Sequence, residues 1–135
     1  MEIKLSNEES EKYFHNALCN GLGYIQGYGI ELTHKEDDYN KARKSIQKKM
    51  DDCKIEKNII CYEDVLVEIL RIGGLLYMED NESNDMNSTI SLADVHNRVA
   101  TTPIEHLTDM ISGNDDATTA DIIIQTVFYK EIIFG

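Results

Sequence analysis

Apolar side chains in the first part of the chain recur at three- and four-residue intervals, which places them on one face of a helix. The residues of this face are Phe14, Ala17, Leu18 and Leu22. Ser6 and Glu9 precede them in the S-x-x-E pattern of a capping box, in which each side chain bonds a free backbone amide of the first turn. The pattern predicts a helix that starts at Ser6. It ends or bends in the glycine-rich stretch 21–29 and leads into an extended segment at 30–32.

Two further helices are predicted at about 36–50 and 62–72. The first has a narrow apolar stripe in an otherwise basic sequence, made of Tyr39, Ala42, Ile46 and Met50. The second presents a broader apolar face, made of Val65, Leu66, Ile69 and Leu70. Polar residues at 51–58 predict a loop between them. The Gly73-Gly74 pair ends the third helix, because glycine tolerates the left-handed conformation found at helix ends.

After the third helix, the sequence predicts two strands and then two short helices. Residues 75–79 and 88–92 predict a β-hairpin whose polar connection, 80–87, suits an exposed loop. Ser91 and Asp94 then form a second capping pair, which opens a short helix to about Ala100. Another helix is expected from Thr102, as its cap, with Pro103 at the first helical position, to Gly113.

The last segment is ambiguous by composition, because its isoleucine, valine and aromatic residues favour strands. Thr118 and Asp121 form a third capping pair, so we predict a helix over about 120–130 and an extended tail at 132–134. The whole pattern predicts a mostly helical α+β fold with a small antiparallel β-hairpin sheet. A length of 135 residues fits a single globular domain spanning 1–135.

Charge is distributed unevenly along the chain. Its 25 acidic and 13 basic residues give a formal net charge of −12. Residues 1–57 nearly balance, with 10 basic and 11 acidic side chains, whereas 58–135 hold 3 basic and 14 acidic ones. Such an acidic surface repels nucleic acid and favours a basic protein partner. The basic stretch 41–57 is interpreted as a solvated face that pairs with the acidic half, within one subunit or between subunits of a homo-oligomer.

Three features bear on the compartment. The N-terminus lacks a basic region followed by an apolar stretch, so no signal peptide is expected. No apolar run approaches the 18 to 20 residues of a membrane span, so no membrane association is expected. Cys19, Cys53 and Cys61 are an odd, widely spaced set, which indicates reduced thiols in a cytoplasm.

Cofactor and metal motifs are incomplete. The glycine cluster at 21–29 is one residue off the dinucleotide fingerprint and follows a predicted helix instead of a strand. His15 and Cys19 are spaced as metal ligands, but neither Cys53 nor Cys61 belongs to a C-x-x-C knuckle. The acidic loop 80–85 lacks the glycine and the glutamate of a calcium loop. We therefore expect no cofactor and no metal.

Acid–base chemistry has four candidate residues, which would meet if their two short helices pack together: Glu105 and the three on which the hypothesis depends, Asp94, His96 and His106. The alternative interpretation is that they are ordinary polar residues on helix surfaces. A small enzyme or ligand-binding domain using these residues is one functional hypothesis. A second is an acidic inhibitor that mimics nucleic acid, since carboxylates along helices can imitate phosphate spacing.

The leading hypothesis is a non-catalytic intracellular protein that acts by binding another protein. Its candidate binding residues are Ile132, Ile133 and Phe134, because an apolar tail near a chain end either docks on its own domain or inserts into a partner.

Most of the chain outside 35–58 resembles a group of small proteins. The stretches "HNALCNGLGYIQGYGIEL", "CYEDVLVEILRIGG" and "LADVHNRVATTPIEHLTDMISGNDDATTADIIIQTVFYKEIIFG" are similar to uncharacterised proteins of bacteriophages and mobile elements of gut bacteria. The resemblance implies no activity that can be carried over to a residue. It implies a phage-like, host-modulating accessory role in the cytoplasm of the host cell.

Overall fold

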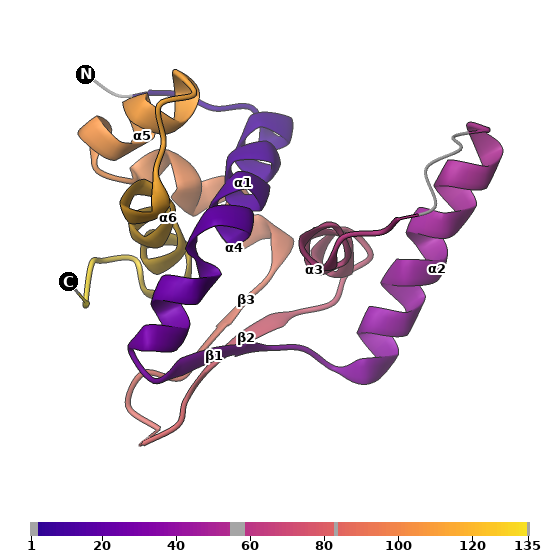
Figure 1. Ribbon diagram of the computed structural model, residues 1–135, viewed down its shortest axis with the longest axis horizontal. Helices are drawn as coiled ribbons and strands as arrows, with labels where there is room; N and C mark the ends of the chain where they lie inside the picture. Colours follow the sequence, from indigo (N-terminus) through magenta and orange to yellow (C-terminus); the bar gives the residue numbers. More distant parts are fainter. Residues whose placement is uncertain (1–2, 55–58, 83, 135) are drawn as a thin grey trace.

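The computed structural model describes residues 3–54, 59–82 and 84–134. Within them the chain forms a mostly helical α+β fold with one small sheet (Figure 1). The helices are α1 (Asn7–Gly27), α2 (Glu36–Asp52), α3 (Tyr62–Arg71), α4 (Leu92–Arg98), the 3-10 turn η1 (Val99–Thr101), α5 (Ile104–Ile111) and α6 (Ala117–Tyr129). The strands are β1 (Ile30–Thr33), β2 (Leu76–Asp80) and β3 (Ser88–Ile90).

Helix α1 begins as the sequence predicts, because Ser6 caps it and Glu9 completes the capping box. It does not end at its first glycines but continues to Gly27. The reason is packing: a Cβ on Gly21 would lie 2.9 Å from the Cβ of Ala120 in α6. Gly21 therefore allows the two helices to approach closely, and the turn after α1 is made instead by Gly29, with a φ of +80°.

The sheet is antiparallel with the order β1-β2-β3. The predicted hairpin is confirmed as β2 and β3, and the extended segment after α1 becomes a third strand, with Ile30 opposite Asp80. Buried side chains from all three strands face the helices; they are Ile30, Leu76, Met78 and Ile90.

Helix α6 is the centre of the core, although its sequence is rich in residues that favour strands. Every residue from Thr119 to Phe128 is buried, and the helix packs mainly against α1, with α5 and β3 also in contact. A largely apolar helix is stable when protein surrounds it on all sides. Tertiary contacts thus outweigh β-propensity in this segment.

Two predicted helix caps are wrong by one and two residues. The N-cap position of α5 is Pro103, one residue after the predicted Thr102, and its side chain makes no capping hydrogen bond. Helix α6 is capped by Asp116, whose carboxylate accepts from the Thr119 amide, so Thr118 and Asp121 are not its capping pair. Asp121 is buried and accepts a hydrogen bond from the Tyr28 hydroxyl.

Helix α2 stands at one side of the molecule and packs on α3, which separates it from α1 and α6 (Figure 1). Its only buried residue is Ala42. The predicted loop at 51–58 falls partly on residues 55–58, which lie outside the described residues, and its first two residues extend α2.

Candidate binding groove

A groove of about 440 Å³ lies where helices α1, α2 and α3 meet. Five apolar side chains line it, from α2, from the segment before α3 and from α3 itself: Ile46, Met50, Ile59, Ile60 and Val67. Seven polar side chains surround them: Glu11, Lys12, His15, Lys49, Asp64, Glu68 and Arg71. The groove therefore has fewer apolar than polar lining residues. Binding sites combine an apolar lining with polar groups that orient what they bind.

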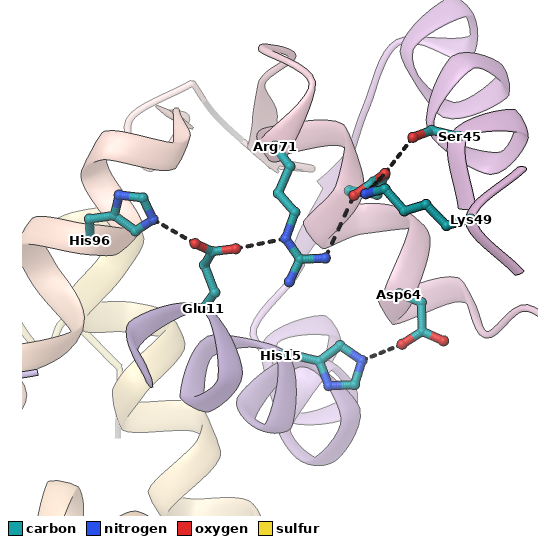
Figure 2. A network of polar contacts seen from close by, with 8 residues as sticks. Glu11, His15, Ser45, Lys49, Asp64, Arg71 and His96 are labelled. Atoms are coloured by element: carbon teal, nitrogen blue, oxygen red, sulfur yellow. Dashed lines mark hydrogen bonds and ion pairs between the residues drawn. The ribbon is translucent and has the colours of Figure 1, made fainter. Parts of the chain in front are cut away.

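The most buried charged group of the groove is Glu68 on α3, whose side chain is 1% exposed. Its Oε2 accepts from the Ser45 hydroxyl at 2.6 Å and from Lys49 Nζ at 2.7 Å, both on α2 (Figure 2). Its Oε1 has no hydrogen bond and lies 3.6 Å from an Arg71 nitrogen. A buried carboxylate thus joins α2 to α3.

Glu11 on α1 extends this network to the rest of the molecule. One of its oxygens lies 2.7 Å from Arg71 Nε and the other 2.8 Å from His96 Nε2 on α4 (Figure 2). A single carboxylate therefore connects three helices that are distant in the sequence.

The pKa values of Glu11 and Glu68 are lowered although both carboxylates are partly or fully buried. Burial opposes the charge of Glu11, but hydrogen bonds from Arg71 and His96 outweigh it and lower its pKa. Burial likewise opposes the charge of Glu68, and Lys49 and Ser45 outweigh it, so its pKa is also lowered. Both groups are therefore ionised at neutral pH and serve as fixed acceptors rather than as proton donors.

His15 and Asp64 form a second link between α1 and α3, with 2.6 Å between Nε2 and the carboxylate oxygen (Figure 2). This pairing places the imidazole hydrogen on Nε2, so Nδ1 of the neutral ring is an acceptor. Cys19 Sγ lies 4.0 Å from that Nδ1. Burial and the neighbouring Glu63, Asp64 and Cys61 raise the pKa of the Cys19 thiol, so its environment does not favour the reactive thiolate.

The acid–base residues expected from the sequence have separate partners. Asp94 accepts from the Ser91 amide and pairs with Arg98 at 3.0 Å, so it serves as a helix cap. His96 bonds Glu11. His106 Nδ1 lies 3.5 Å from the Thr119 hydroxyl. Of the three, only His96 joins the polar network beside the groove.

The predicted binding tail is placed against its own domain. The amides of Ile133 and Phe134 donate to Gln125 Oε1, each at 2.8 Å. The ring of Phe134 stacks on Tyr28, with 4.7 Å between the ring centroids. The side chains of Ile132 and Ile133 remain 45% and 37% exposed.

The metal motifs have no structural counterpart in the described part of the chain. There, no group of three or more histidine, cysteine, aspartate or glutamate side chains is arranged to hold a metal ion. Cys19, Cys53 and Cys61 are all free thiols. Over the same residues, no helix is long and apolar enough to cross a membrane.

No local signal in the sequence marks the groove itself. The network joins two helices that are far apart in the sequence: Glu11 is on α1, and Arg71, 60 positions later, is on α3 with Glu68. Nothing nearby in the chain identifies these residues as partners. The one clue was a charge at position 68 among apolar neighbours, since a buried glutamate requires a cation or hydrogen-bond donors.

Comparison with known proteins gives no match: no protein-family model, no curated protein and no solved structure is significantly similar to this chain.

Proposed function

We propose that this protein acts without catalysis, as a phage-like, host-modulating accessory factor that binds a partner protein through the α1–α2–α3 groove. One observation carries the assignment: Ile59, at the apolar lining of the groove, is 71% exposed, more than any other large apolar side chain among the described residues. A large apolar group held in the open beside a concave surface becomes favourable when a partner covers it.

The charges around the groove support binding over chemistry. Glu11 and Glu68 are each paired with a cationic side chain of the same molecule, Arg71 and Lys49, and Asp64 is hydrogen-bonded to His15. Their ion pairs need no ligand, so a partner gains mainly by burying apolar surface. Polar groups around an apolar centre are typical of protein interfaces.

The state of the Cys19 thiol, which lies beside His15, also supports a function without catalysis. An activated cysteine requires a lowered pKa, and the pKa of Cys19 is raised. The exposed side chains of Ile132 and Ile133 remain a second candidate contact for the partner, whereas the side chain of Phe134 stacks on Tyr28 within the fold.

The test uses the wild-type protein and three variants as bait in a lysate of the host cell. Ile59→Glu places a charge in the groove, Ile132→Glu places one on the tail, and Ile104→Glu changes an isoleucine that is 44% exposed on α5, away from the groove. We expect one captured protein to be lost with Ile59→Glu and retained with Ile104→Glu, while the melting temperatures of all variants stay within a few degrees.

Capture that survives Ile59→Glu but fails with Ile132→Glu would move the site to the tail. Equal capture by all four proteins would contradict the groove as the binding site.

A further inference from the structure

Three aromatic rings form a cluster at the end of β1 and the starts of α2 and α3. His34 stacks on Tyr39 with 4.9 Å between ring centroids and an angle of 19°. Tyr62 completes the cluster, with its centroid 6.1 Å from that of Tyr39 and 6.0 Å from that of His34. We name these three residues the aromatic cluster; none of them lines the groove.

The aromatic cluster is only partly covered by the fold. Tyr62 is 42% exposed, and His34 and Tyr39 are half-buried. Three rings that touch each other usually belong to a core, where they bury most of their area. Aromatic groups left at a surface are enriched in binding interfaces, where tyrosine and arginine dominate the binding energy.

Acidic residues adjoin the aromatic cluster along the chain: Glu63 follows Tyr62 in α3, and Glu31 lies on β1, three residues before His34. Burial, followed by Tyr39 and the charges of Glu31 and Glu63, raises the pKa of Tyr62. The segment 31–40, which carries two of the three rings, contains four acidic residues and a single lysine, Lys35. The surface therefore combines exposed π-systems with a negative field.

We propose that the aromatic cluster is a docking site for an arginine side chain of a basic protein segment. A guanidinium is planar and stacks on an aromatic face, while its N–H groups bond flanking carboxylates. The face of Tyr62 offers the stacking surface, and Glu31 and Glu63 supply the acceptors. The same carboxylates repel nucleic acid, so charge complementarity selects a basic protein segment.

This site extends the proposed function, since it names the chemistry of the partner, but it has a test of its own. A hexa-arginine peptide is titrated into the wild-type protein at about 50 mM salt, where exposed charges are screened least. Binding is followed by the NMR signals of the tyrosine rings. We expect the Tyr62 ring signals to shift most, and hexa-arginine to bind more tightly than hexa-lysine.

Variants separate ring stacking from general attraction to an acidic protein. Tyr62→Leu removes the ring but keeps an apolar group, and we expect about two- to fivefold weaker binding of hexa-arginine, the loss of one exposed cation–π contact. Tyr62→Phe retains the ring and the affinity. Tyr24→Leu removes a tyrosine that is 47% exposed on α1, and it serves as the matched control with unchanged affinity.

Equal affinities of Tyr62→Leu and Tyr24→Leu would overturn the assignment, as would equal binding of hexa-arginine, hexa-lysine and spermine. Because the groove is not involved in this titration, the result leaves the outcome of the Ile59→Glu capture unaffected.

Circular dichroism of each variant checks that the fold is retained. The double variant Glu31→Gln/Glu63→Gln provides a second test that leaves all three rings in place. This double variant is expected to weaken hexa-arginine binding, and unchanged binding would contradict the role of the carboxylates.

Discussion

At the residue scale, Glu68 is a buried carboxylate that joins α2 to α3. A buried carboxylate is costly unless charges and donors compensate it, and here the compensation comes from Ser45 and Lys49 on a different helix. The two members of the Glu68–Lys49 ion pair differ in burial: Glu68 is 1% exposed and Lys49 is 63% exposed. Removing the lysine takes the nearest cation from a buried carboxylate and leaves it with Ser45 and the more distant Arg71. Removing the glutamate leaves a cation that water can solvate.

We expect Lys49→Ala to lower the free energy of unfolding by about 2–3 kcal/mol at pH 7, because it leaves Glu68 without its nearest cation. Lys48→Ala is the matched control: that side chain is exposed, so its replacement should cost less than about 0.5 kcal/mol. Urea denaturation measures both. Adding Glu68→Gln to Lys49→Ala should recover part of the loss; a larger loss in the double variant would contradict this account.

The lowered pKa values of Glu11 and Glu68 predict a pH dependence of stability. A carboxyl group with a lower pKa in the folded state stabilises the protein above its unfolded pKa, and it loses that contribution as pH falls through its folded pKa. The reference value is 4.5 for both groups. We expect the free energy of unfolding to decrease below about pH 5. The variant Glu11→Gln/Glu68→Gln should show a shallower decrease in urea titrations, and an equally steep one would contradict the assignment.

At the element scale, the packing of α1 on α6 depends on one glycine. A Cβ at position 21 would lie 2.9 Å from both Ala120 Cβ and Ile124 Cδ1, so Gly21→Ala must push the helices apart. We expect a net loss of about 1–3 kcal/mol. A Cβ at position 23 would meet no atom within 4 Å, so Gly23→Ala should instead gain up to about 1 kcal/mol from helix propensity. Thermal unfolding of the two variants compares them directly, and a shift of the same sign for both would contradict the close contact.

The C-terminal tail depends on one buried side chain of α6. Gln125 accepts two amides of the tail and donates to the Phe134 carbonyl oxygen at 3.2 Å. We expect Gln125→Ala to destabilise the fold by about 1–3 kcal/mol, because several hydrogen bonds are lost at once. Hydrogen exchange at Ile133 and Phe134 should then accelerate. Exchange as slow as in the wild type would show that the ring stack on Tyr28 is sufficient to hold the tail.

Local signals in the sequence were enough for most elements. The capping pairs at Ser6 and Ser91 and the stop at Gly73, whose φ is +93°, are confirmed because they depend only on neighbouring residues. The course of α1 through Gly21 was not predictable in this way, since it depends on contact with a helix about 100 residues later. The same holds for the addition of β1 to the hairpin.

The groove was less predictable than the fold. A pairing such as Glu11 with Arg71 depends on how helices cross, and a single sequence carries no information on that geometry. The histidines illustrate the difficulty. His96 was considered as a base and His15 as a metal ligand, yet each is held by a carboxylate from another helix.

At the scale of the whole molecule, the net charge of −12 acts against compactness. Excess negative charge repels itself most strongly at low ionic strength, where the screening length is about 30 Å at 0.01 M. We expect the melting temperature to rise as sodium chloride increases from about 0.01 to 0.2 M, over which the screening length falls to less than 10 Å. Differential scanning calorimetry measures the change. A melting temperature that falls with salt would mean that internal ion pairs outweigh this repulsion.

Helix α2 also has a consequence for how the chain tolerates change. It is joined to α3 by Ser45 and Lys49, which donate to Glu68, and Ala42 is its one buried residue, whereas Asn40, Lys41, Arg43 and Lys44 are exposed. Variants of α2 that keep the residues facing α3 and change the exposed ones are therefore expected to fold with the rest of the chain. The exposed face of this helix is accordingly expected to tolerate substitution, which makes it a suitable place to graft a reporter.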